Sequence, residues 1–326
     1  MKLVFTQKPV GLAVFGLIFA GVVSLYTGVS DLDTGQIVRA FLYGGEHDFV
    51  VNHYRLPRLV LAMLVGTGLG LSGVLVQGVI RNPLASPDLM GISAGAGLAA
   101  TSLLVIFPQA PLWALPVVAI VGGLLAAMMI YATAMLTKPT PARLALTGVA
   151  ISAFLSSGID FLLIVHPIEV NTAMVWLTGS LWGRNWQQFP LLFAAVCLLI
   201  PVAFWLAWRL DVLGSGELIA RGLGVHVTQV QVLALIVSVV LASVSVSVAG
   251  TISFVGLLSP HLARLLVGSK HHILIPMAAL IGAILVLVSD ILARGLIPPT
   301  EFPAGVITSV IGAPYFIYLL SRYKGW

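Results

Sequence analysis

The chain has 326 residues, of which 59% are hydrophobic and only 8% are charged, and its mean hydropathy is +1.09. A soluble domain of this length cannot bury so much apolar surface, so the composition excludes an ordinary water-soluble fold. The formal net charge of +5 does not indicate nucleic-acid binding, because excess Lys and Arg in a membrane protein mark its cytoplasmic loops.

Apolar runs of about 20 residues recur along the whole chain, and each predicts a membrane-spanning helix. Two of the ten runs, the third and the eighth, are short for a full crossing. The chain is therefore predicted to form one all-α integral membrane domain over residues 1–326. The expected spans are Val10–Val29, Leu59–Ile80, Ser93–Phe107, Leu112–Leu136, Leu144–Val165, Phe189–Trp208, Val230–Val248, Ile252–Val267, Ile273–Leu292 and Ala304–Leu320.

The first run could instead be a signal peptide, since Lys2 and Lys8 precede it. No small-x-small cleavage site with a polar continuation follows, so a retained helix is expected.

The distribution of basic residues orients the spans. With ten spans and a cytoplasmic N-terminus, eleven Lys and Arg residues fall on the inner side and five on the outer side. This bias agrees with the positive-inside rule and predicts that both termini are cytoplasmic. The five outer residues are Arg39, Arg55, Arg58, Arg184 and Arg294.

Glycines cluster inside two spans, in Gly66-x-Gly68-x-Gly70-x-x-Gly73 and Gly91-x-x-x-Gly95-x-Gly97. The first cluster contains a literal GxGxxG, but no strand precedes it, so it is not read as a dinucleotide site. Small residues at these spacings let helix backbones approach closely, and both clusters predict helix packing.

One polar patch, Leu213–His226, interrupts the apolar sequence on the inner side. Small residues, paired charges and glycine stops predict a short exposed helix there, and such a helix is suited to contact a soluble partner. The residues expected to carry this contact, within a region of about 211–228, are Gly216, Glu217, Ala220, Arg221, Gly222 and Gly224.

The sequence lacks the residue clusters that are typical of metal sites and enzyme active sites. The seven His residues are scattered without metal-ligand spacing, and neither a Ser-His-Asp grouping nor a P-loop occurs. The sequence thus predicts no resident metal, no cofactor and no enzymatic activity, and ATP hydrolysis would need a separate subunit. An ion-coupled transporter working alone stays as an alternative, but Asp160 and Asp290 are too few for a proton relay. A membrane-embedded enzyme is a third, weaker alternative.

Several stretches together resemble the permease subunits of the bacterial iron-siderophore and cobalamin ABC importers, the FecCD type. The resemblance covers nearly the whole chain in matching order. Within this family, Leu177–Trp186 and Arg143–Ala150 look most like the permeases for ferric dicitrate. The stretches are Tyr54–Arg58, Gln77–Ile92, Leu146–Ala150, Gly216–Gly224, Gly250–Arg264, Asp290–Arg294, Glu301–Gly305 and Gly312–Phe316.

The resemblance implies a type II ABC importer permease fold in the bacterial inner membrane. It implies two permeases on two ATP-binding subunits. The second permease can be an identical copy or a different chain, and the resemblance to the dicitrate permeases favours a different, homologous chain. A periplasmic substrate-binding protein would deliver a ferric chelate, ferric siderophore or iron(III) dicitrate, from outside; cobalamin or haem is the alternative cargo. The Gly216–Gly224 patch matches the coupling helix that contacts the ATPase.

The resemblance also suggests further site residues. Arg55, Arg58 and Arg294 would receive acidic groups of the binding protein at an exposed outer rim, unless they reach lipid phosphate or, for Arg294, pair with Asp290. A cytoplasmic gate would form at the turn Thr140, Pro141 and Ala142, which could also be a plain tight connection. The fifth and tenth spans would line the pore, with Thr147, Ser152 and Thr308 as candidate lining residues.

Overall fold

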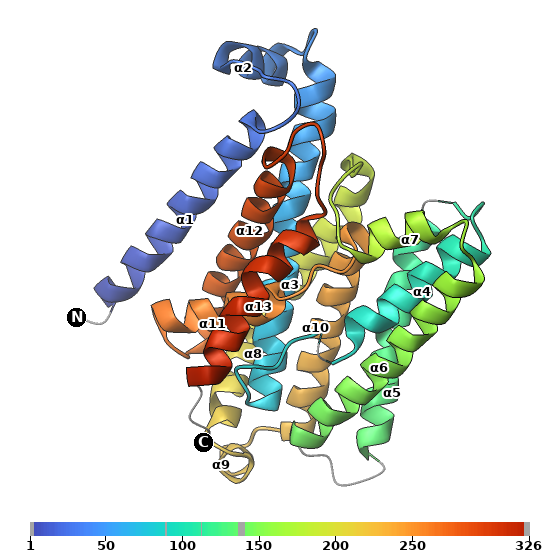
Figure 1. Cartoon of the computed structure of the whole chain (residues 1–326). Coiled ribbons are helices and arrows are strands. Elements are labelled where there is room, and N and C mark those ends of the chain that lie inside the picture. The colour runs from blue at the N-terminus through green and yellow to red at the C-terminus, as the bar shows by residue number, and fades with distance from the viewer. Residues whose placement is uncertain (1–2, 89, 112, 136–140, 323–326) are drawn as a thin grey trace.

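A computed structural model of the chain describes residues 3–88, 90–111, 113–135 and 141–322, and the secondary structure there is helical (Figure 1). Each of the ten expected spans corresponds to one helix, so the all-α membrane fold is confirmed. These helices are α1 (Leu3–Tyr26), α3 (Leu56–Ile80), α4 (Ile92–Ile106), α5 (Ala114–Met135), α6 (Pro141–Val165), α8 (Phe189–Gly214), α10 (Val227–Ala249), α11 (Val255–Val267), α12 (His271–Gly295) and α13 (Ala304–Arg322).

The two loops that the distribution of basic residues assigns to the outer side, between α1 and α3 and between α6 and α8, each contain a helix. The terms outer and inner follow that assignment below. The first holds α2 (Thr34–Tyr43) and a π-helical turn, η1 (Phe49–Arg55), that runs directly into α3. The second holds α7 (Val170–Leu177) and a 3₁₀ turn, η2 (Trp186–Gln188), that runs into α8. A capping box between Asp33 and Gln36 starts α2, a short-range signal that the sequence offered.

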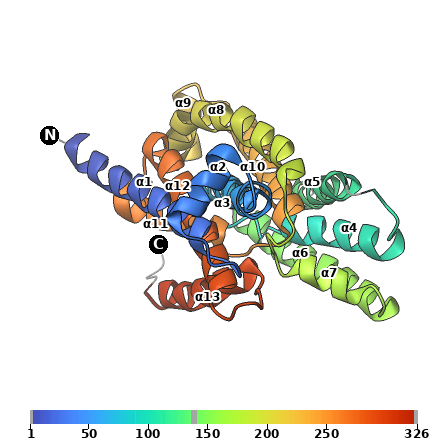
Figure 2. The ribbon, with the colours of Figure 1, turned by 90° about the horizontal axis from the view of Figure 1, so that it is seen from above.

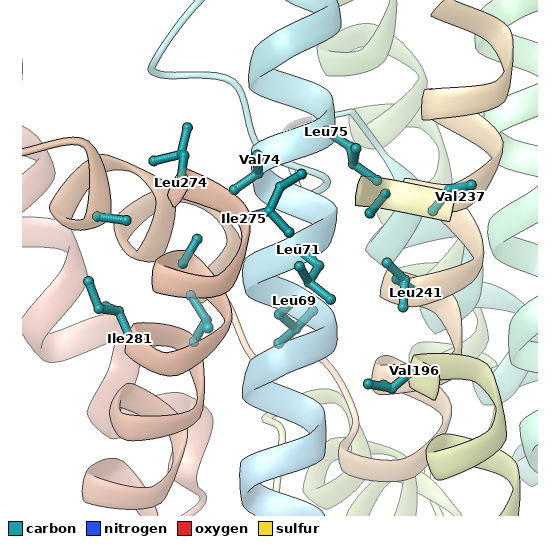
Figure 3. Close-up of a cluster of buried hydrophobic side chains, with 14 of the residues drawn as sticks. Leu69, Leu71, Val74, Leu75, Val196, Val237, Leu241, Leu274, Ile275 and Ile281 are labelled. Carbon is teal, nitrogen blue, oxygen red and sulfur yellow. The ribbon is translucent and has the colours of Figure 1, made fainter. Parts of the chain in front are cut away.

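The centre of the molecule is α3, which packs against α12, α10, α11 and α8. Figure 3 shows its apolar side chains Leu69, Leu71, Val74 and Leu75 between residues of α12 and α10. All four are at most 2% exposed. Because lipid is as apolar as these side chains, close packing rather than the hydrophobic effect must hold the helices together here.

Glycine allows that packing where α3 crosses α12. A Cβ built on Gly66 would collide with the carbonyl oxygen of Gly282, and one built on Gly282 would collide with the carbonyl oxygen of Gly66. The predicted packing role of the α3 glycine cluster is therefore confirmed at this crossing.

Helices α4 and α11 are short, with 15 and 13 residues, as the sequence predicted. Each starts after a residue in left-handed backbone conformation, Gly91 before α4 and Phe254 before α11. Both first turns are buried, so surrounding helices shelter the irregular backbone that precedes them, as membrane proteins require.

The helices at the periphery leave apolar faces uncovered within this chain. Only 11% of the most apolar stretch of α6 is buried inside this chain, against 72% of the corresponding stretches that contain α3 and α10. Seen from above, α6 and α13 lie on the same side of the molecule (Figure 2). Lipid or further subunits must cover these faces, because an unpartnered apolar surface of this extent is unstable in water.

Candidate coupling and docking sites

The polar patch folds as predicted into a short helix, α9 (Glu217–Gly222), between α8 and α10. Gly216 before it and Gly224 after it have φ of +112° and +79°, a region that glycine adopts without strain. Ala220 is fully buried, and the amide of Val225 donates to its carbonyl at 2.9 Å. Helix α9 is thus fixed to the membrane domain through one small side chain and its C-terminal turn.

Large apolar side chains of α9, and of the residue that follows it, are exposed to solvent. Leu218, Ile219 and Leu223 are 87%, 54% and 60% exposed, although α9 lies outside the candidate membrane spans. Arg221 is also exposed. A cluster of apolar residues with a charged neighbour is the composition of a protein contact surface. The sequence analysis emphasised the charges and missed these apolar contacts.

Glu217 has an internal partner that the sequence did not reveal. Its Oε1 accepts a hydrogen bond at 3.2 Å from Nη2 of Arg81, which follows the last residue of α3. Arg81 has φ of +55°, an uncommon conformation for a non-glycine residue. This partly exposed ion pair links the end of the central helix to α9.

At the outer end of α3, Arg58 lies in a buried ionic cluster. Its Nε donates to Oδ1 of Asp290 at 2.9 Å, and its Nη1 donates to Oε2 of Glu301 at 2.7 Å and to the hydroxyl of Tyr54 at 3.0 Å. Arg58 is 1% exposed, and the Asp290 side chain is 0% exposed. Arg294 pairs with the other carboxylate oxygen of Asp290 at 3.1 Å. The positive charges of Arg58 and Arg294 thus match the negative charges of Asp290 and Glu301.

Two arginines also hold the outer end of α1. Arg55 donates to the carbonyl oxygens of Leu25, Tyr26 and Ser30, and Arg294 donates to that of Thr27 at 2.9 Å. The carbonyl groups at a helix C-terminus lack helical partners and carry partial negative charge, so guanidinium groups stabilise them. These bonds join the end of α1 to the start of α3 and the end of α12.

The expectation that Arg55, Arg58 and Arg294 stand at an exposed rim is therefore wrong, since each is 1% exposed. The alternative pairing of Arg294 with Asp290 is confirmed. Sequence reasoning could not find the long-range partners, because Glu301 and Asp290 lie more than 200 residues from Arg58. Contact with a binding protein stays a prediction.

The candidate gate and pore residues are only partly placed. Thr140 lies outside the described residues, and of Pro141 and Ala142 only their place in the first turn of α6 is described. Thr147 and Ser152 are half-buried on α6. Thr308 is 5% exposed and donates to the carbonyl of Gly305 within α13. The lining of a pore by these three residues stays a prediction.

Asp160 is exposed on α6, five residues before the end of this apolar helix at Val165. A carboxylate at such a place needs water or a partner, which supports α6 as a helix facing a pathway or another subunit. No group of three metal-ligating side chains occurs in the part of the chain that the structure describes.

Comparison with known proteins identifies the architecture. Residues 16–322 match the model of the FecCD transport family. The chain is 44% identical to the Fe(3+)-citrate import system permease protein YfmE of Bacillus subtilis (strain 168), over 93% of this chain and 92% of that one. It is 42% identical to the Fe(3+) dicitrate transport system permease protein FecD of Escherichia coli (strain K12), over 92% of this chain and 94% of that one.

The fold is likewise that of a known transporter. A metal-chelate type ABC transporter in an inward-facing conformation superposes with a TM-score of 0.84, covering 98% of this chain and 100% of that one at 30% identity. Together with the ten helices and the exposed α9, these matches show that the chain belongs to the FecCD transport family, as a permease subunit of an ABC importer rather than an enzyme.

Proposed function

We propose that this permease moves an iron(III) dicitrate-type chelate into the cytoplasm across the bacterial inner membrane, driven by a separate ATPase. The observation that carries the proposal is α9, a rigid helix outside the membrane spans with Leu218, Ile219 and Leu223 exposed. The names of the relatives, which refer to Fe(3+)-citrate and Fe(3+) dicitrate, support the choice of cargo.

In this proposal, two ATP-binding subunits contact α9 of this chain and the matching helix of a second, homologous permease. Both termini are cytoplasmic, in keeping with the excess of basic residues on the inner side. The uncovered faces of α6 and α13 form the pathway together with the second permease, and the turn at Thr140, Pro141 and Ala142 narrows its inner end.

A periplasmic binding protein delivers the chelate to the outer face. Because Arg55, Arg58 and Arg294 already serve internal partners, we assign them the indirect role of holding the outer ends of α1, α3 and α12 in place for docking. Direct contact would require these guanidinium groups to leave buried partners, which is costly.

Uptake in cells tests the cargo. A strain that lacks this gene should lose uptake of radiolabelled ferric dicitrate and keep its uptake of labelled cobalamin. The gene on a plasmid should restore the lost uptake, and Leu218→Asp should fail to restore it despite normal membrane insertion. Unchanged ferric dicitrate uptake in the deletion strain, with loss of cobalamin uptake, would assign the other cargo.

A further inference from the structure

Arg184, in the outer loop between α7 and α8, differs from the arginines of the buried ionic cluster. Among the described residues, no carboxylate lies within ion-pair distance of it, and its side chain makes no hydrogen bond. Its Nε is buried without a partner, and the side chain as a whole is half-buried. The Nε of Arg184 has therefore lost water without gaining a hydrogen-bond partner, which is unfavourable.

The backbone on both sides of Arg184 is fixed. Gly183 before it has φ of +70°. Asn185 after it starts η2 with a capping box, in which its Oδ1 accepts from the amide of Gln187 at 2.9 Å and its own amide donates to Oε1 of Gln188 at 2.9 Å. The position of Arg184 is therefore set in advance, and a ligand would not have to order the loop.

This loop and η1 enclose a hollow of about 430 Å³. Trp186 ties its two walls together, since its Nε1 donates to the carbonyl of Asn52 at 2.8 Å. Phe49, His53 and Tyr54 line one wall, and Arg184, Asn185 and Trp186 line the other. A hollow of this volume has room for a small tricarboxylate and not only for a single carboxyl group.

The other charged groups around the hollow are already engaged. His53 lies 3.4 Å from Oδ2 of Asp48, and the Tyr54 hydroxyl donates to Oε1 of Glu301 at 3.0 Å. Burial lowers the pKa of Arg184 from its usual value. Among the described residues that line the hollow, the guanidinium is thus a positively charged donor without a carboxylate partner.

We propose that Arg184 and this hollow bind a carboxylate presented from the outer side of the membrane. The planar fork of arginine matches a carboxylate through two parallel hydrogen bonds, and burial strengthens them. The carboxylate belongs either to the tricarboxylate chelate or to an acidic side chain of the binding protein. Only this choice of source rests on the proposed function.

Two measurements separate these sources, both on the purified transport complex in nanodiscs of zwitterionic lipid. In the first, citrate is titrated while tryptophan fluorescence is recorded, and Trp186→Phe identifies the signal that comes from the hollow. In the second, the association of the binding protein is followed by surface plasmon resonance. Each is made with Arg184→Gln and with Arg39→Gln, a matched loss of charge on exposed α2.

If the chelate is the source, Arg184→Gln weakens citrate binding at least about tenfold, the loss expected for a charge-assisted hydrogen bond, and Arg39→Gln does not. If the binding protein is the source, Arg184→Gln weakens association of the binding protein and Arg39→Gln does not, whereas the two variants bind citrate equally. Equal behaviour of the two variants in both measurements overturns the proposal, as does inorganic phosphate binding as tightly as citrate. Citrate binding does not depend on transport, so loss of the import function leaves this test intact.

Should Arg184→Gln fail to fold, the wild-type complex still decides the matter. Phenylglyoxal modifies accessible arginines, and mass spectrometry locates the modified residue. Protection of Arg184 by citrate or by the bound binding protein supports the site. Modification at the same rate with and without both overturns it.

Discussion

Replacing Arg58 by Met tests whether the outer ionic cluster is structural. The substitution keeps an unbranched stem about as long as that of arginine up to Nε and removes the charge, so the buried Asp290 and the partly buried Glu301 each lose a partner. Removing one partner of a buried ion pair costs about 3–5 kcal/mol. We expect the free energy of unfolding to fall by an amount near the lower end of this range, about 3 kcal/mol. Asp290 keeps its ion pair with Arg294 at 3.1 Å, and Glu301, which is 14% exposed, keeps its hydrogen bond with Tyr54.

The loss of stability can be measured by unfolding the purified protein reversibly in mixed micelles of increasing SDS content. Arg39→Met is the control, because it removes an outer arginine that is exposed on α2. If Arg58→Met is as stable as Arg39→Met and loses only its response to the binding protein, the structural interpretation is refuted and Arg58 is a docking residue.

Further substitutions address coupling, packing and gating. Arg221→Glu should leave membrane insertion intact and uncouple ATP hydrolysis from transport, so a fully coupled variant contradicts the role of α9. Leu218→Ser removes a side chain that is 87% exposed and should weaken ATPase binding in pull-down assays without lowering the stability of the permease, whereas equal binding would exclude this face. Gly66→Ala should destabilise the protein by about 1–3 kcal/mol or more, because the added methyl group meets the backbone of Gly282; unchanged SDS unfolding would contradict the close crossing. Cysteines at Ala142 and in the partner permease should crosslink in one nucleotide state only, and crosslinking that is equal in all states would argue against a gate.

The sequence predicted the helices better than their contacts. Apolar runs located the ten helices because membrane helices must satisfy their own backbone hydrogen bonds. Among the described residues, seven helices are long and apolar enough to span a membrane, whereas α4, α11 and α13 are shorter. Glycine spacing and the polar patch also led to correct local predictions, at Gly66 and at α9. In contrast, α2 and α7 were missed because both are short and lie in segments of mixed polarity.

Partners far apart in the chain could not be found from a single sequence. Arg58 was placed correctly at the outer end of α3, but its burial depends on Glu301, 243 residues away. The same holds for Arg81 and Glu217, 136 residues apart. A charge at a helix end is compatible with docking, lipid contact or an internal pair, and only the fold decides among them.

The central claim is that this chain is the permease of an ATP-driven importer. Reconstitution in proteoliposomes tests it most directly: this chain, the second permease and the ATPase are incorporated, and the binding protein loaded with radiolabelled ferric dicitrate is added outside. The account predicts accumulation that requires ATP inside the vesicles and all three membrane components, and that continues when ionophores collapse every ion gradient. Accumulation by this chain alone, driven by an ion gradient and indifferent to ATP, would contradict it.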